Sequence, residues 1–406
     1  MNSAVAISPA ARRYALAILT IVYMFNFIDR QILAILLPAI REEFQVSDAW
    51  LGFLTGPAFA MFYITLGIPI ARYADRHNRR NLIALAVALW SGMTALSGLV
   101  TNFVQLALAR VGVGIGEAGC SPPAHSMIAD YYPPEKRSTA MGVYTVGISA
   151  GIMLAYLLGG WVAHNVGWRE ALLVVGLPGL LLALVVRTTV AEPIRGHSEG
   201  RAATRERPPW RETLAFLWAR PSFVHMTVAA GLSAFVGYSV VNFLPRFLVR
   251  SFGMNVATLG LWLGPILGIA GGAGFFLGGY VADHLPFAAM FLSGSWLVAI
   301  LLFVVPACTS NVYLAPVLAL SQGLVSLRMR AVTSALALLV INVIGLLFGP
   351  QVTGLLSTAL EPHFGEESIR YALLIVAVVF LPWAAFHYFR AARTIDDDLA
   401  GAADND

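Results

Sequence analysis

Residues 14–38 read YALAILTIVYMFNFIDRQILAILLP, a continuous apolar stretch that carries an acid and a base side by side, Asp29 and Arg30. About 20 apolar residues cross the hydrocarbon core of a membrane, so the stretch predicts a membrane-spanning helix. A charge at the centre of such a helix costs about 2.5–3.5 kcal/mol, and charged residues there usually face a polar interior and serve a function. Both side chains could instead reach water from a helix end, but the apolar run continues from Ile32 to Leu37. We therefore interpret Asp29 and Arg30 as functional.

The composition supports a membrane protein. Of the 406 residues, 58% are hydrophobic and 12% are charged, and the mean hydropathy is +0.74. Soluble domains carry about 25% charged residues, so the chain is predicted to be an integral membrane protein. The apolar runs are continuous and lack the alternating pattern of outer-membrane strands, which favours helices over a barrel. The net charge of +4 is small and the basic residues lie in loops, so no nucleic-acid partner is indicated.

Two cysteines offer no metal site. Cys120 and Cys308 lie in different apolar runs without metal-type spacing, and we interpret them as small buried hydrophobic residues. Neither a metal nor another cofactor is expected.

The sequence contains twelve apolar runs, six on each side of a polar gap. The twelve runs cover residues 14–38, 51–71, 82–100, 103–129, 139–163, 169–190, 222–248, 256–282, 286–308, 312–327, 331–358 and 369–389. The gap between them, 191–220, holds six arginines and Pro208-Pro209, and is interpreted as a linker. We therefore predict an all-α membrane protein of twelve transmembrane helices in two pseudo-symmetric six-helix bundles, residues 1–190 and 221–406.

Basic residues indicate the orientation. With the N-terminus inside, nineteen Lys and Arg residues lie in inner segments and five in outer ones. This bias predicts that both termini and the linker are cytoplasmic. An internal repeat supports the two bundles, because Ala-Asp followed by a basic residue closes both the second and the eighth run, at 74–76 and 282–284. Paired bundles of this kind are typical of transporters, whose substrate site lies at the repeat interface near the midplane.

Two stretches resemble a known family. The segment Gly67–Arg80, GIPIARYADRHNRR, resembles the loop signature between the second and third helices of the major facilitator superfamily, with Arg72 and Asn78 where glycines are common. Within that superfamily, Asp29-Arg30 resembles the first helix of the spinster family of lipid transporters. The segment RVGVGIGEA, residues 110–118, followed by Ile-Ala-Asp at 128–130, resembles its fourth helix. The resemblance implies the twelve-helix fold and a lysolipid or sphingolipid substrate.

The charged residues of these two helices are predicted to lie together. At 1.5 Å per residue, Asp29, Arg30 and Arg110 lie roughly 10–12 Å from the outer ends of their helices, and Glu117 lies two turns deeper than Arg110. Two acids and two bases form a neutral group, and a carboxylate that exchanges partners changes its proton affinity. We predict that Asp29 and Glu117 sense protons and that Arg30 and Arg110 are their partners or bind a substrate headgroup. A fixed salt bridge between helices one and four is the alternative.

A second predicted site lies at the cytoplasmic turn after residue 74. The family resemblance implies that this turn is a cytoplasmic gate, and we assign that role to Asp75 and Arg76. Arg79 and Arg80 are expected only to set the membrane orientation.

The predicted cavity is charged on one wall and apolar on the other. Its expected lining residues are Phe25, Tyr63, Tyr144, Tyr238, Asn242 and Asn342. Such a cavity suits an amphipathic molecule, whereas a small organic anion or drug-like compound held by Arg30 and Arg110 is the alternative. His125 could join the proton path, but we favour its interpretation as a buried core histidine.

The predicted function is proton-coupled transport by alternating access, because no nucleotide-binding domain or Na⁺ site is recognisable. Two sequence motifs resemble those of enzymes: GxGxxG at 114–119, as in dinucleotide-binding proteins, and GxSxG at 147–151, as in hydrolases. Both lie inside predicted apolar helices, where small residues instead allow close helix packing. The chain is therefore expected not to be an enzyme. We expect a monomer in a bacterial inner membrane whose partners are protons, a small amphipathic substrate and the lipid bilayer.

Overall fold

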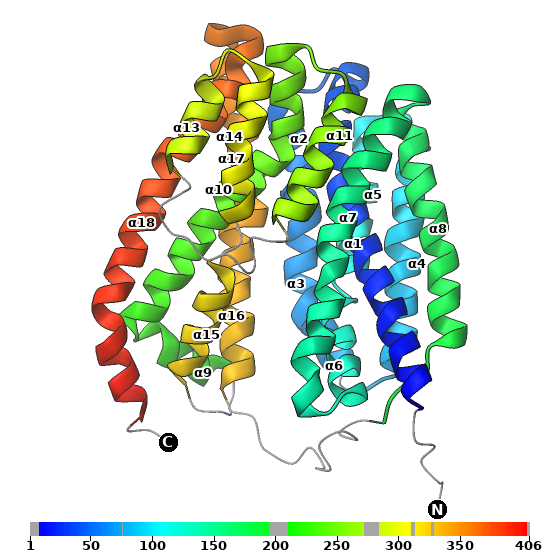
Figure 1. Ribbon diagram of the computed structural model, residues 1–406, viewed down its shortest axis with the longest axis vertical. Helices are drawn as coiled ribbons and strands as arrows, with labels where there is room; N and C mark the ends of the chain where they lie inside the picture. The colour runs from blue at the N-terminus through cyan, green and yellow to red at the C-terminus, as the bar shows by residue number, and fades with distance from the viewer. Residues whose placement is uncertain are drawn as a thin grey trace, which may run out of the picture. The chain divides into compact units, whose positions relative to one another are not determined.

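Helices make up nearly all of the chain that the structure describes. The computed structural model describes residues 8–74, 76–194, 210–271, 284–309, 313–325 and 329–403, and no strand occurs among them. Seven helical segments within these ranges are long and apolar enough to cross a membrane. Close contacts divide the chain into two units (Figure 1): unit 1 holds residues 1–45, 58–204 and 254–269, and unit 2 holds residues 46–57, 205–253 and 270–406.

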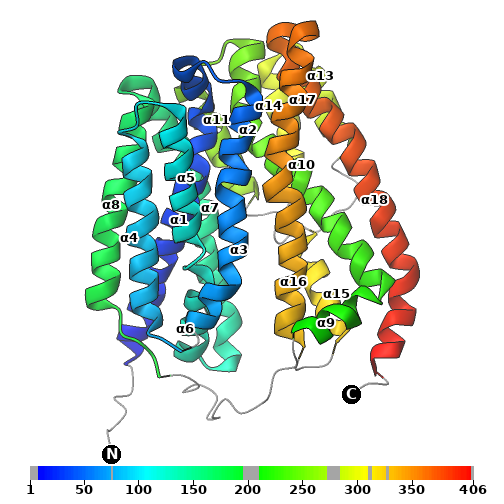
Figure 2. The same cartoon turned by 180° about the vertical axis from the view of Figure 1, so that it is seen from behind.

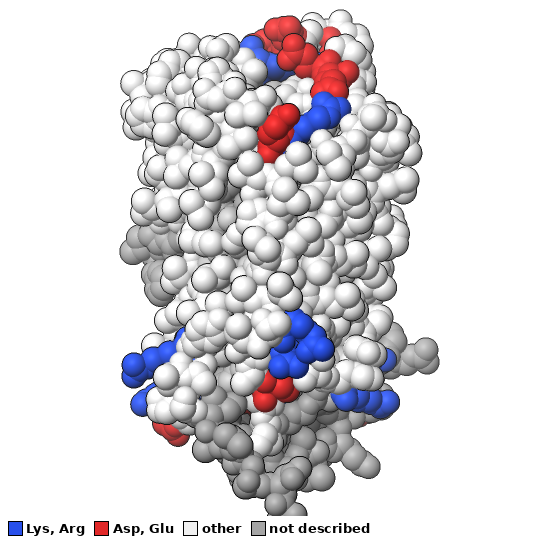
Figure 3. Space-filling view, turned by 90° about the vertical axis from the view of Figure 1, so that its right-hand side faces the viewer, with Lys and Arg blue, Asp and Glu red and all other residues white. Residues whose placement is uncertain are grey.

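Unit 1 is a bundle of membrane-length helices and shorter segments. It contains α1 (Pro9–Phe44), α3 (Pro57–Ala74), α4 (Arg79–Ser97), α5 (Phe103–Glu117), α6 (Ser121–Tyr131), α7 (Pro134–Asn165), α8 (Trp168–Thr189) and α11 (Val256–Pro265), which a π-helix, η1 (Ile266–Ala270), continues. α1 packs along α7, and α4 packs between α5 and α8. On the face shown in Figure 3, charged side chains lie in two groups separated by a broad uncharged band, as expected of membrane-spanning helices.

The expected single run over 103–129 is interrupted beside its charged residue. α5 ends at Glu117, and α6 begins at Ser121 with a proline in its first turn. Proline lacks the backbone N–H that a helix interior requires, so Pro122 and Pro123 favour a new helix start there. Glu117 is therefore the last residue of α5, and α6 begins four residues later.

Glycines on α5 allow close helix packing. A Cβ on Gly114 would collide with the carbonyl oxygen of Phe59 on α3, and one on Gly116 would lie 2.7 Å from the backbone nitrogen of Trp90 on α4. We expect Gly116→Ala to lower the free energy of unfolding by about 1–3 kcal/mol, as overpacking usually does. Gly142→Ala on α7 is the matched control, because its Cβ would meet no atom within 4 Å. It should stabilise the helix by about 0.5–1 kcal/mol. Thermal melting in detergent measures both effects. A shift of the melting temperature in the same direction for Gly116→Ala and Gly142→Ala would contradict this explanation.

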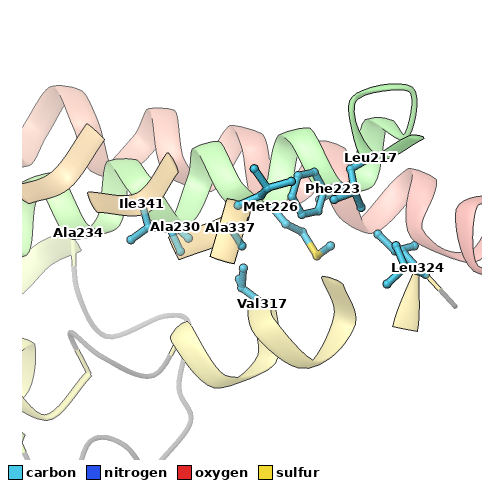
Figure 4. Packing of buried hydrophobic residues seen from close by; sticks show 12 residues of the cluster. Leu217, Phe223, Met226, Ala230, Ala234, Val317, Leu324, Ala337 and Ile341 are labelled. Carbon is cyan, nitrogen blue, oxygen red and sulfur yellow. The ribbon is translucent and has the colours of Figure 1, made fainter. Parts of the chain in front are cut away.

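Unit 2 contains the first short helix after α1 and most of the C-terminal half. Its helices are α2 (Asp48–Thr55), α9 (Trp210–Trp218), α10 (Pro221–Phe252), α13 (His284–Leu292), α14 (Trp296–Thr309), α15 (Leu314–Gly323), α16 (Arg330–Asn342), α17 (Phe348–Phe364) and α18 (Ser368–Ala403), with the π-helix η2 (Val343–Leu347) before α17. α10 packs along α18, and α2 packs on α17 (Figure 2). A core at one end of the unit joins Phe223 and Met226 of α10 to Val317 of α15 and Ala337 of α16 (Figure 4).

Two features of unit 2 differ from expectation. The run 286–308 is not one helix: α13 ends at Leu292 and α14 begins at Trp296, and the two pack against each other. The reason is the turn sequence Ser293-Gly294-Ser295, in which the Ser293 hydroxyl oxygen accepts a hydrogen bond from the Ser295 backbone N–H at 3.1 Å. The linker 191–220 also contains a helix, α9, that was not expected.

Some predictions fall outside the described residues. These include residues 280–283 of the internal repeat and residues 195–209 of the linker. The division into residues 1–190 and 221–406 stays a prediction. The units defined by contacts exchange two segments across that boundary, since residues 46–57 belong to unit 2 and residues 254–269 to unit 1.

Candidate functional site

A buried ion pair joins α1 to the end of α5. Arg30 donates two hydrogen bonds to Oε2 of Glu117, from Nη2 at 2.6 Å and from Nε at 3.1 Å. The Glu117 side chain is fully buried, and the Arg30 side chain is 10% exposed. Charge-assisted bonds of this kind are stronger in a low-dielectric interior than in water. The second oxygen, Oε1, is buried and accepts no hydrogen bond from any described residue.

Aromatic rings surround the Arg30 guanidinium. Its central carbon lies 5.1 Å from the ring centre of Phe27, 5.0 Å from that of Phe59 and 4.8 Å from that of Tyr63. A cation over an aromatic face is attracted by the negative charge of that face, by about 2 kcal/mol when water is excluded. The rings therefore stabilise a cation where a lipid environment would reject one.

Arg110 holds α5 to the backbone of α1. Its Nη1 and Nη2 donate to the carbonyl oxygens of Asp29 and Arg30 at 3.2 and 3.3 Å, and its guanidinium lies 4.6 Å from the Phe59 ring centre. The Arg110 residue is only 6% exposed. Its hydrogen bonds hold in place the helical turn that carries both Asp29 and Arg30.

Asp29 points away from the ion pair. Its carboxylate is buried beside the side chains of Trp90 and Thr94 of α4. The four charged residues thus gather in one place, which we call the charge cluster (Asp29, Arg30, Arg110 and Glu117). They do not form two matched ion pairs, because Arg30 binds Glu117 while Asp29 faces α4.

The predicted cavity residues of unit 1 lie on different sides of α1. Tyr63 packs against Arg30 within the charge cluster, and it stacks on Phe59 with ring centres 5.4 Å apart. Tyr144 of α7 stacks on Tyr23 of α1 at 4.2 Å. Phe25 instead faces Gly179 of α8, so it lies on the same side of α1 as Asp29.

The predicted cavity residues of unit 2 lie on α10 and α16. Asn242 donates from Nδ2 to the carbonyl oxygen of Tyr238, four residues earlier on the same helix, at 2.8 Å. Asn342 is the last residue of α16 and directly precedes the π-helix η2. Short π-helices often occur at functional sites. The cavity role of all six residues stays a prediction.

The predicted cytoplasmic gate is described only in part. Asp75 lies outside the described residues, and the side chain of Arg76 is exposed. The expectation that Arg79 and Arg80 only set the orientation is wrong. Arg79 is 2% exposed and donates to Glu192 at 2.8 Å, to Ser126 at 2.8 Å and also to Asp130. The Arg80 backbone N–H donates to the other oxygen of Glu192 at 2.8 Å. These contacts join the start of α4 to α6 and to the segment after α8.

We expect Arg79→Ala to lower the free energy of unfolding by about 1.5–3 kcal/mol, the value of one hydrogen bond to a charged group. Arg79→Lys should not restore stability, because an ammonium cannot reproduce the planar fork that serves several acceptors at once. Arg76→Ala is the control, and its exposed side chain predicts a change within about 0.5 kcal/mol. Equal melting temperatures for Arg79→Ala and Arg76→Ala would contradict a structural role for Arg79.

A second buried ionic site, in unit 2, was missed. Asp48 of α2 is fully buried and bonds to Nε of Arg246 at 2.6 Å and to the hydroxyl of Ser357 on α17 at 2.6 Å. Arg250, one turn beyond Arg246 on α10, lies 3.4 Å from the other carboxylate oxygen. The available signal was the pair of arginines at i and i+4, which must face one side of a helix.

Comparisons with known proteins identify the family of this chain. Residues 19–339 match the family model described as Major Facilitator Superfamily. The chain belongs to the major facilitator superfamily. It is 31% identical over 401 residues to an MFS-type efflux pump of Mycolicibacterium smegmatis, covering 93% of this chain and 92% of that one. It is 32% identical over 250 residues to human protein spinster homolog 1, of which the match covers 47%.

A solved structure is similar over nearly the whole chain. It is the crystal structure of a bacterial homolog to the human lysosomal transporter spinster, in an inward-facing and unoccupied conformation. The identity is 34% and the TM-score is 0.87, with 96% of this chain and 99% of that chain covered. The chain is therefore a membrane transporter related to spinster proteins and not an enzyme.

Proposed function

We propose that this transporter carries an amphipathic molecule of lysolipid or sphingolipid type and couples its movement to protons. The observation that carries the proton coupling is the pairing within the charge cluster. Glu117 uses one oxygen for Arg30 and leaves the other without a hydrogen bond from a described residue, and Asp29 is buried beside the neutral side chains of Trp90 and Thr94. A buried charge without a partner is costly, and a proton removes that cost.

The coupling follows from a competition between a proton and Arg30. When Glu117 binds a proton, its attraction for the guanidinium falls and Arg30 is released from the ion pair. Released, Arg30 can bind an anionic headgroup or move with a change in helix arrangement. By linkage, any conformation that separates Arg30 from Glu117 takes up a proton more readily. Proton binding therefore biases alternating access.

The relatives carry different names and do not identify one substrate. Human protein spinster homolog 1 and an efflux pump share 32% and 31% identity with this chain, whereas a probable L-galactonate transporter of Escherichia coli shares 24%. A small organic anion is the second candidate, because two arginines of the charge cluster lie beside aromatic rings. We further propose that both termini are cytoplasmic and that the protein is a monomer in a bacterial inner membrane.

Thermal stabilisation tests the substrate class. A ligand that binds the folded state at 100 times its dissociation constant stabilises it by about 2.7 kcal/mol. We expect lysolipids and sphingoid lipids to raise the melting temperature, and the rise to depend on pH. The panel should include organic anions, and a two-chain phospholipid serves as the control for unspecific lipid effects. Stabilisation by organic anions alone would contradict the lipid assignment.

A further inference from the structure

An exposed histidine lies beside a buried tyrosine near the charge cluster. His125 of α6 is exposed, and its ring meets the edge of the Tyr144 ring at 5.4 Å and 81°. Tyr144 is fully buried and stacks on Tyr23 at 4.2 Å. Because its side chain is accessible to solvent, His125 is not the fully buried core residue that we expected. Its position is better explained by its chemistry.

One buried oxygen near this histidine, Oε1 of Glu117, accepts no hydrogen bond from a described residue. The hydroxyl of Tyr144 is also buried, and it lies beside the side chain of Ser121. The buried Cys120 lies beside Glu117. An unsatisfied buried polar group costs about 1–3 kcal/mol. A tyrosine hydroxyl can accept a proton on one side and donate its own on the other.

The location of His125 suits an entry point for protons. It follows Glu117 by eight residues, beyond the break between α5 and α6. The far end of α6 is held at the predicted cytoplasmic end of unit 1, where Arg12 donates to the carbonyl oxygen of Tyr131 at 3.5 Å and Arg79 binds Asp130. His125 therefore lies along the chain between Glu117 and the cytoplasmic end.

We propose that His125 and Tyr144 relay protons between the cytoplasm and Oε1 of Glu117, an inference that rests on the proposed proton coupling of this site. Imidazolium gives up its N–H proton to the Tyr144 oxygen while the tyrosine releases its own proton toward the Ser121 hydroxyl. The serine in turn passes a proton to Glu117, where an O–H bond forms and the charge on Oε1 is removed. One proton moves in total, and both hydroxyls end as they began.

Histidine suits this task because its unperturbed titration lies close to neutral pH. The charged groups on the helices around it are Arg12, Arg13, Asp29, Arg30, Arg41, Glu42 and Glu43 on α1, Arg79 and Arg80 on α4, Arg110 and Glu117 on α5, Asp130 on α6, and Glu135, Lys136 and Arg137 on α7. Arg12, Arg79 and Arg137 each bind a group on α6 other than His125, namely Tyr131, Asp130 and Ala129. Arg30 and Arg110 are engaged within the charge cluster.

The relay is tested by the rate at which Glu117 takes up a proton. A laser-released pH jump on the full-length protein, followed by infrared spectroscopy, detects the carbonyl stretch of a protonated carboxyl group without any substrate. We expect His125→Ala and Tyr144→Phe each to slow the Glu117 signal at least about tenfold while leaving its final amplitude unchanged. Added imidazole should restore the rate in His125→Ala but not in Tyr144→Phe. His164→Ala, on the exposed last turn of α7, is the matched control.

The outcomes separate the relay from the proposed function. A wild-type rate in folded His125→Ala, or a slowed rate that imidazole does not restore, overturns the relay. His125→Gln serves as the second variant if the alanine variant does not fold. If no carbonyl signal disappears in Glu117→Gln, then Glu117 is not the proton site, and the proposed coupling fails independently of His125.

Discussion

Glu117→Gln is expected to uncouple transport from the proton gradient, lowering gradient-driven accumulation at least about tenfold while exchange of substrate at equal pH continues. The amide oxygen can still accept a hydrogen bond from Arg30, so the helices stay joined, but the amide cannot bind a proton at physiological pH. Because the glutamine is not protonated, a change in pH does not weaken its interaction with Arg30. The measurement is uptake of a lysolipid from the thermal panel into proteoliposomes, with and without an imposed pH difference.

Asp29→Asn provides the second arm of this experiment. Asp29 is buried beside Thr94 and Trp90 of α4, and asparagine keeps the size and a carbonyl acceptor, so this neutral isostere should be tolerated by the fold. Glu43→Gln is the matched control, because Glu43 is 41% exposed and its partner Arg169 is 29% exposed at the other end of α1. Wild-type pH dependence in both Asp29→Asn and Glu117→Gln would leave a fixed salt bridge as the correct interpretation of the charge cluster.

Asp48→Ala is expected to have the largest effect on stability, lowering the free energy of unfolding by about 3–5 kcal/mol. The substitution leaves the guanidinium of Arg246 buried, at 3% exposure, without its carboxylate. It also removes the acceptor of the Ser357 hydroxyl. Denaturation in detergent with increasing SDS, or thermal melting, measures the loss. The same change in the exposed Glu43–Arg169 pair should cost no more than about 1 kcal/mol.

A double-mutant cycle separates the ion pair from the cost of an unpaired charge. Asp48→Ala combined with Arg246→Ala should be less destabilising than the sum of the two single variants, because no charge is left buried. Arg250→Ala should have a smaller effect than Arg246→Ala, since Arg250 lies 3.4 Å from the carboxylate and Arg246 lies 2.6 Å from it. Additive losses for Asp48 and Arg246 would show that the two residues do not interact.

Local patterns predicted the helices well and the turns poorly. Residues 14–38 contain enough apolar side chains to predict α1, which extends from Pro9 to Phe44. The run 286–308 is equally apolar, but Ser293-Gly294-Ser295 breaks it into α13 and α14. A short polar turn changes mean hydropathy too little to be noticed over a window of about 20 residues, although its residue types are those of a turn.

For charged residues, the sequence showed where they are but not which distant residues they bind. Arg79 was expected only to set the membrane orientation, yet it is buried because Asp130 and Glu192, distant in sequence, supply its acceptors. Asp48 escaped notice because an acid at the start of an apolar run is ordinary at a helix N-terminus. Its importance depends on Arg246, almost two hundred residues later.

By itself, the sequence determined that this chain is a helical membrane protein of the transporter type, because the length of apolar runs and the cost of charge in lipid are properties of single segments. It also identified Asp29, Arg30, Arg110 and Glu117 as unusual. Only the tertiary structure decided that Arg30 binds Glu117, that Arg110 binds the backbone of α1, and that Asp29 faces α4. The physical reason is that ion pairing depends on how long side chains cross between helices, and helix depth alone does not specify that direction.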